Sequence, residues 1–187
     1  MVASAYYGEV GYRFATLPLT PKLWYSYATF SGDDPSSPQY GRFDPLYFGN
    51  DNDTWSFGTL SSYAFRNSNV NFSTVALDLT AGKQDDVKLQ YVHTRANELV
   101  SVTLGPLAGS GLTLFNGDLT LPALTNHNLA DEIDATWTHK FKPNVTGTFS
   151  PAVAFPGPGL TSLPAGAKTW FGASASLRVT TPGYDEP

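Results

Sequence analysis

The stretch EIDATWTHKFKPNVTGTF, residues 132–149, decides the fold that the sequence predicts. In its first half apolar and polar residues alternate, so that Ile133, Ala135, Trp137 and Phe141 share one side of an extended chain. A Lys-Pro-Asn break separates this half from a second alternating run, and two such runs joined by a tight turn predict a β-hairpin. Whether the apolar side faces a protein core or lipid determines what class of protein this is.

Seven segments of the chain alternate in this way, and almost nothing shows a helical period. Each segment is roughly nine to twelve residues long, which exceeds the usual length of soluble strands and matches a tilted strand crossing a bilayer. The predicted strands are residues 4–14, 22–30, 70–80, 86–94, 132–141, 145–154 and 168–179.

The connections between these strands alternate in length. Short links at 15–21, 81–86 and 142–144 alternate with long links at 31–69 and 95–131, and a medium link follows at 156–167. This parity predicts an all-β fold, an antiparallel transmembrane β-barrel with short periplasmic turns and long outer loops. Because single-chain bacterial barrels have even strand numbers, we expect about 7–8 strands here, as part of a larger barrel. Residues 1–187 then form one barrel domain or barrel segment, with a C-terminal tail at 180–187.

The composition excludes several other classes. Charged residues are only 14% of the chain, against roughly 25% in typical soluble domains. No basic stripe accompanies the net charge of −5, so no nucleic-acid partner is expected. Without cysteine there are no disulfides or thiolate metal sites, and no apolar run is long enough for a transmembrane helix. The first residues lack the charged start and apolar core of a secretory signal peptide.

The polar sides of the strands supply the candidate functional residues. In a barrel they line a water-filled path, and their charges tune which solute passes. The predicted pore-lining residues are Glu9, Arg13, Lys22, Asp78, Lys88, Gln90, Glu132, Asp134, Lys140 and Arg178. Five of these are positive and four are negative, so the predicted lumen is close to neutral. In an ordinary soluble sheet the same residues would be a solvated face.

The apolar sides carry aromatic residues close to the short links. We predict an interfacial aromatic girdle at the membrane boundary, formed by Tyr12, Phe14, Tyr25, Trp137 and Phe141. The alternative is core packing. His139 shares this side, where headgroup water would satisfy its ring.

Other chemistry has little support in the sequence. Asp51 and Asp53 are a weak candidate for a Ca²⁺ site, because the rest of an EF-hand loop is missing around them. The three histidines show no ligand-like pairing, and no nucleophile-elbow or phosphate-binding glycine motif is present. We therefore expect no metal, no cofactor and no catalytic residue.

Two motifs resemble the outer-membrane alginate-export porin family. FDPLYFG at 43–49 is similar to an FDPL-type motif of that family, and DEIDATWTHKFKPNVTGTFSPAVAFPGPG at 131–159 resembles its acidic strand, Pro-Asn turn and F-P-G exit. A C-terminal strand that opens with Trp170 also fits. The resemblance implies a barrel of roughly eighteen strands, of which this chain would be the C-terminal portion, passing an anionic polysaccharide through a strongly basic lumen.

The sequence thus predicts a passive outer-membrane channel of a Gram-negative bacterium. Its partners would be membrane lipid or lipopolysaccharide, a hydrophilic solute or anionic polysaccharide, and either other chains or a missing N-terminal segment that closes the barrel. Two alternatives stay open: a soluble or periplasmic β-barrel or sandwich that binds a ligand, and a structural barrel subunit of an envelope assembly. The direction of Leu23, Tyr25, Leu89, Ile133, Trp137 and Leu177 separates them, since a shared interior would contradict the membrane interpretation.

Overall fold

The protein is described by a computed structural model that covers residues 2–43, 57–65, 67–100, 103–104, 119–120, 123–163 and 167–180. Its strands are β1 (Ala5–Arg13), β2 (Lys22–Phe30), β3 (Val70–Ala81), β4 (Asp85–Ala96), β5 (Thr103–Leu104), β6 (Leu119–Thr120), β7 (Asn128–Lys142), β8 (Val145–Pro156) and β9 (Trp170–Val179). Two one-turn helices are α1 (Ser61–Ala64) and α2 (Pro158–Thr161).

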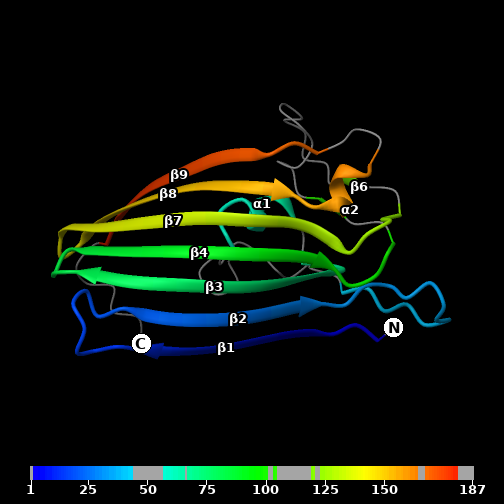
Figure 1. Ribbon diagram of the computed structural model, residues 1–187, viewed down its shortest axis with the longest axis horizontal. Helices are drawn as coiled ribbons and strands as arrows, with labels where there is room; N and C mark the ends of the chain where they lie inside the picture. Colours follow the sequence, from blue (N-terminus) through cyan, green and yellow to red (C-terminus); the bar gives the residue numbers. More distant parts are fainter. Residues whose placement is uncertain are drawn as a thin grey trace.

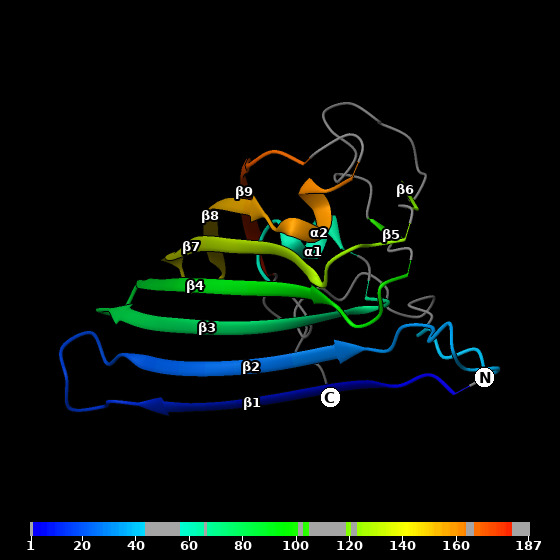
Figure 2. The same ribbon diagram turned by 45° about the vertical axis from the view of Figure 1, so that its right-hand side comes forward.

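Seven of the strands form one antiparallel sheet in the order β1-β2-β3-β4-β7-β8-β9, and β5 pairs with β6 separately. Each long strand therefore lies beside its neighbour in the chain, as in an up-and-down barrel wall (Figure 1). The turned view shows the sheet curving from β1 to β9, with α1 and α2 on the same side of it (Figure 2). The predicted all-β antiparallel fold is confirmed. In the described part of the chain β1 and β9 are the sheet edges, and the sheet is a partial barrel.

The predicted division into short and long connections is also confirmed. The short connections β1–β2, β3–β4 and β7–β8 lie together at one end of the sheet, called here the turn end, and the long connections lie at the other, the loop end (Figure 1). At the β3–β4 turn Gly82 has a φ of +80°, which a residue with a side chain rarely adopts. The β7–β8 hairpin closes through Pro143 and Asn144 alone, because Lys142 pairs with Val145.

Alternation and register give the sheet two distinct faces. The inner face is the one that carries Ala28, Phe72, Glu132 and Ala152, and the outer face carries the residues between them. Six apolar side chains of the outer face are each 42–65% exposed: Leu23, Tyr25, Leu89, Ile133, Trp137 and Leu177. They do not form a common interior. A soluble barrel or sandwich that packs its core on these residues is therefore contradicted.

The buried core of the described chain lies on the inner face, towards the loop end. Ala28 and Phe30 of β2, Phe72 of β3 and Val92 of β4 are all nearly inaccessible. They are covered by residues from the connections, among them Phe57, Phe65, Leu124 and Leu160. The inner face is thus packed near the loop end and becomes more polar towards the turn end.

Strand boundaries differ in places from the sequence prediction. β7 starts at Asn128, four residues earlier than expected, and register shifts occur at Thr94/Arg95 and Lys140/Lys142. Each bulge inserts one residue and shifts the alternation by one position, so a strict two-residue period does not extend across it; Leu129 and Ala130, on the two sides of the first shift, are both buried. Within the described residues, no helix combines the length and apolarity that crossing a bilayer requires.

Candidate functional site

Residues 57–65, called here the inner segment, are part of the long β2–β3 connection. They lie across the inner face of the sheet. The segment contains α1 and touches strands from one edge to the other, from Tyr7 of β1 to Gly172 of β9. In Figure 1 α1 lies behind the middle of the sheet, overlapping β7 and β8. Sequence analysis placed these residues in an outer loop and did not predict the inward fold.

Two acidic side chains of β7 hold the inner segment. Glu132 accepts hydrogen bonds from the backbone N–H of Leu60 at 2.7 Å and of Ser61 at 2.6 Å. Asp134 accepts one from the backbone N–H of Thr59 at 3.0 Å. The two carboxylates and these three N–H groups are called the carboxylate clamp. Three hydrogen bonds from consecutive backbone N–H groups therefore tie the inner segment to β7.

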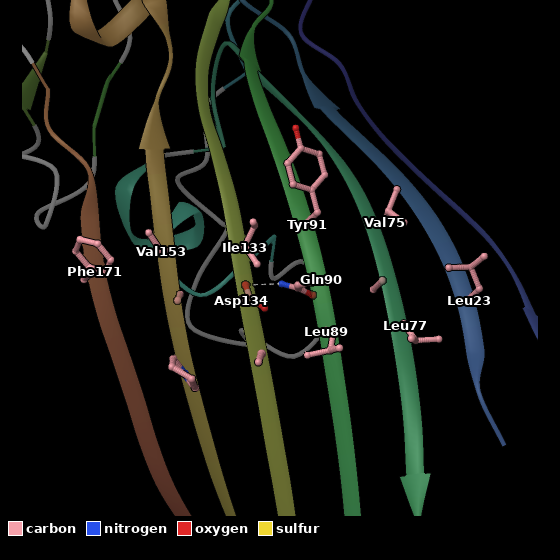
Figure 3. A pocket seen from close by; sticks show the side chains of 14 residues that line it. Leu23, Val75, Leu77, Leu89, Gln90, Tyr91, Ile133, Asp134, Val153 and Phe171 are labelled. Carbon is pink, nitrogen blue, oxygen red and sulfur yellow. Dashed lines mark hydrogen bonds between the residues drawn. The ribbon is translucent and has the colours of Figure 1, made fainter. Parts of the chain in front are cut away.

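The clamp is buried. Glu132 is 0% exposed and Asp134 is 2% exposed. Asp134 also accepts a hydrogen bond from Nε2 of Gln90 at 2.8 Å, the contact drawn in Figure 3. A buried carboxylate is stable only when donors surround it, and here the backbone of the inner segment supplies most of them. All three residues lie on the inner face of the sheet, where the inner segment covers them.

Two glycines allow the close approach of the inner segment to the sheet. Gly58 has a φ of +84°, and a Cβ there would lie 2.7 Å from Oε2 of Glu132. On β9, a Cβ at Gly172 would lie 2.6 Å from Cδ2 of Leu60. A side chain at either position would push the segment away from the strand that it contacts.

An aromatic cluster anchors the same segment on the β2–β3 side. The ring of Phe57 stacks on that of Phe72, with centroids 4.5 Å apart and an interplanar angle of 11°. Phe30 approaches Phe57 edge-on at 6.1 Å, and Tyr7 lies at 6.4 Å. Apolar burial of Phe57 and the carboxylate clamp on residues 59–61 therefore fix the segment across the inner face.

The ionic side chains of the inner face are concentrated towards the turn end. Lys22 pairs with Glu9 at 3.1 Å, and Lys140 pairs with Asp86 at 3.3 Å. Outside the clamp, the inner face of the seven strands carries five basic side chains and three acidic ones: Arg13, Lys22, Lys88, Lys140 and Arg178 against Glu9, Asp78 and Asp86. Register therefore brings all ten predicted pore-lining residues to one face. The accessible part of that face has a more positive net charge than the ten predicted residues together, because the clamp buries two of the acids.

The predicted aromatic girdle residues all lie on the outer face and are exposed. Tyr12 and Phe14 form an edge-to-face pair with centroids 4.9 Å apart. Tyr25 lies further along β2, and Trp137 and Phe141 flank His139 on β7.

His139 has a protein partner at this position, where we expected water. Its Nδ1 lies 2.7 Å from Oδ1 of Asp85, which also accepts a hydrogen bond from Nε1 of Trp137 at 2.8 Å. Both donors belong to β7 and the acceptor begins β4, so the pair of bonds links two strands of the wall at its turn end.

The outer face next to these aromatic residues is apolar, and closer to the loop end it carries a polar group in which Oδ1 of Asp131 lies 2.7 Å from Nδ1 of His93 and accepts the hydroxyl of Tyr91. A shallow hollow of about 660 Å³ spans the strands from β2 to β9. Figure 3 shows Leu23, Leu77, Leu89, Ile133 and Phe171 around it, on the face turned away from α1. Apolar side chains on the outside and charged ones on the inside are the reverse of a soluble domain.

The F-P-G motif at the end of β8 has a steric explanation. Gly157 donates its N–H to the carbonyl of Leu129 at 2.7 Å, and a Cβ at Gly157 would lie 2.7 Å from the carbonyl oxygen of Asn128. At Gly159 the corresponding distance to the carbonyl oxygen of Asn126 is 2.6 Å. The exit of β8 therefore packs directly on the entry to β7.

Two other predicted features lie outside the described residues. These are the candidate Ca²⁺ ligands Asp51 and Asp53, and all of the FDPLYFG motif except Phe43. Among the residues described, no group of three or more His, Asp or Glu side chains is arranged to hold a metal ion.

Comparison with known proteins identifies the family. The family model described as alginate export matches residues 2–164, which is most of the chain. A search of curated proteins finds no match. The matched family is a transport family and not an enzyme family, and its proteins are porin-like channels of the outer membrane. The sheet, with its apolar outer face and charged inner face, agrees with this family. Because the family model matches residues 2–164, the chain belongs to the alginate export family of outer-membrane porins.

Proposed function

We propose that the chain forms part of the wall of an outer-membrane pore through which a hydrophilic polymer diffuses passively, and that the inner segment is the constriction of that pore. The observation that carries this proposal is the polarity of the sheet. Its outer face exposes Leu89, Ile133 and Phe171, and its inner face holds the basic residues and the carboxylate clamp. Water on the inside removes the desolvation cost of moving a polar solute through hydrocarbon.

The orientation follows from the connections. Short turns are periplasmic and long loops are external in bacterial barrels, so the turn end faces the periplasm and the inner segment descends from outside. In a Gram-negative outer membrane the solute would then meet Arg13, Lys22, Lys88, Lys140 and Arg178 before it reaches the constriction. Export from the periplasm would therefore pass the basic residues first and the constriction second.

An anionic polysaccharide is the solute that this arrangement favours. With Glu132 and Asp134 held by backbone N–H groups, basic residues outnumber acidic ones on the accessible inner face. The near-neutral balance counted from the sequence included both of these buried acids. The structure of the clamp thus supports a mildly basic path, which attracts a polyanion without holding it tightly.

Further strands must complete the wall. The edges β1 and β9 present backbone N–H and C=O groups that lipid cannot satisfy. We propose that additional strands, from the same protein or from other copies, pair with both edges and close the barrel.

Conductance in a planar bilayer tests the proposal. The protein should insert, conduct with a preference for anions, and show current block by alginate oligosaccharides added on the turn-end side. Lys88→Gln should reduce the anion preference, because Lys88 lies on the inner face. The matched control Lys83→Gln lies in the exposed β3–β4 turn and should leave selectivity unchanged. A protein that inserts stably and never conducts would instead be a structural envelope subunit.

A further inference from the structure

A second hollow lies between the inner segment and the last strand. It has a volume of about 370 Å³, within the ~300–1,000 Å³ range of small-molecule pockets. Its lining from the inner segment includes Thr59, Leu60 and Tyr63, and β9 contributes every residue from Trp170 to Ser174, so the hollow borders the edge of the sheet. Neither the predicted pore-lining residues nor the carboxylate clamp side chains line it.

The hollow combines aromatic side chains with unused polar groups. Tyr63 is 52% exposed, and Trp170 is partly buried against the core cluster. Four polar groups of the lining have no hydrogen-bond partner among the described residues: the indole N–H of Trp170 and the hydroxyls of Tyr63, Thr59 and Ser174. Aromatic rings together with free hydroxyls suit a ligand that has an apolar face and a hydroxylated rim.

No charged side chain lines the hollow. A ligand bound there is therefore recognised by shape, stacking and hydroxyl contacts. A charge on the ligand has no charged partner in the lining. A sugar ring in its chair form meets this description, because its axial C–H groups make an apolar face and its hydroxyls surround the edge.

We propose that this hollow is a saccharide subsite, which takes one sugar ring of the exported polymer beside the constriction. The proposal rests on the proposed pore function and adds the part of the solute that is recognised there. The basic residues near the turn end attract the charge of the polymer, whereas Tyr63 and Trp170 contact its rings. The clamp fixes the geometry, since the N–H of Thr59 binds Asp134 and the N–H of Leu60 binds Glu132.

Calorimetric titration of the whole protein in detergent tests the subsite without requiring conduction. The probes are an alginate hexasaccharide and a neutral maltohexaose. Trp170→Ala should weaken binding of both by about 3- to 10-fold, and Trp170→Phe should restore most of the alginate affinity. Trp137→Ala, which removes an exposed tryptophan of the outer face, should bind like wild type.

A second variant protects the test against misfolding. Tyr63→Ala removes a side chain that is more than half exposed, and it should weaken binding by a similar factor. Wild-type affinity in both Trp170→Ala and Tyr63→Ala would overturn the subsite, as would a failure of wild type to bind either sugar or to bind the neutral one.

Bilayer recordings on the same preparations separate the two proposals. A protein that conducts but binds sugar independently of Trp170 keeps the pore function and loses the subsite. A protein that binds through Trp170 but never conducts keeps the subsite and loses the pore.

Discussion

Removing the carboxylate of Glu132 should release the inner segment. Glu132→Ala deletes the acceptor of two short hydrogen bonds, from the N–H groups of Leu60 and Ser61. Each buried N–H group that loses its acceptor costs about 1–3 kcal/mol. Burying the carboxylate, and its repulsion from Asp134, offset part of this. We therefore expect a net loss of about 2–4 kcal/mol, which raises the open population of the segment roughly 30- to 700-fold.

Hydrogen–deuterium exchange resolved to peptides measures this opening directly. The peptide that covers residues 57–65 should exchange far faster in Glu132→Ala than in wild type, while peptides from β3 and β4 should not change. Glu132→Gln keeps one carbonyl oxygen as an acceptor and should show an intermediate rate. In bilayers the mean conductance should rise, because the constriction spends more time open.

Glu9→Ala is the matched control. Glu9 is also an acid of the inner face, but it is exposed and binds Tyr7 and Lys22 instead of the inner segment. It should leave the exchange of residues 57–65 at the wild-type rate. Equal exchange in wild type and Glu132→Ala would refute the clamp as the anchor, and equal acceleration in Glu9→Ala would refute its specificity.

Two glycine substitutions give further predictions. Gly58→Ala should loosen the inner segment by about 1–3 kcal/mol and raise its hydrogen exchange, because the new Cβ meets Glu132 at a strained φ. The control is Gly82→Ala, which has a similar φ of +80° but nothing within 4 Å of its Cβ. It should leave the exchange of the segment unchanged. Gly159→Ala should impair assembly, because its Cβ would meet the carbonyl oxygen of Asn126; heat-modifiable gel migration measures this. The control is Gly8→Ala on β1, where the Cβ has open space, and it should assemble normally.

The sheet could be predicted from the sequence because a strand leaves a local record. Alternation placed Leu89 and Gln90, or Trp137 and Thr138, on opposite faces, and the structure places them so. Turn residues such as Gly82 and the Pro143-Asn144 pair marked the short connections. These features depend on residues close together in the chain, which is why the bounds of β2 and the position of the β7–β8 turn were predicted correctly.

The inner segment could not be predicted in the same way. Its anchors join residues more than 70 positions apart, and the donors are backbone N–H groups, which every residue except proline possesses. One indication was present: Phe57, Leu60, Ala64 and Phe65 are apolar residues in a connection expected to be polar. The two acids of EID were recognised as inward-facing, but their partner was not. Their apparent conflict with a polyanionic solute came from counting them as accessible.

The central claim is that the outer face of the sheet contacts lipid, and neighbouring arginine substitutions on β9 test it most directly. Ala175 lies on the outer face and Ser176 on the inner face, and both are exposed. The measurement is the free energy of unfolding of the protein reconstituted in lipid vesicles. Ala175→Arg should lower it by about 1 kcal/mol or more, since arginine on the lipid face costs from about 1 kcal/mol near the interface to about 2–4 kcal/mol at the midplane, and Ser176→Arg should change it little. Equal tolerance of both substitutions would contradict the account, because two solvated faces would accept arginine alike.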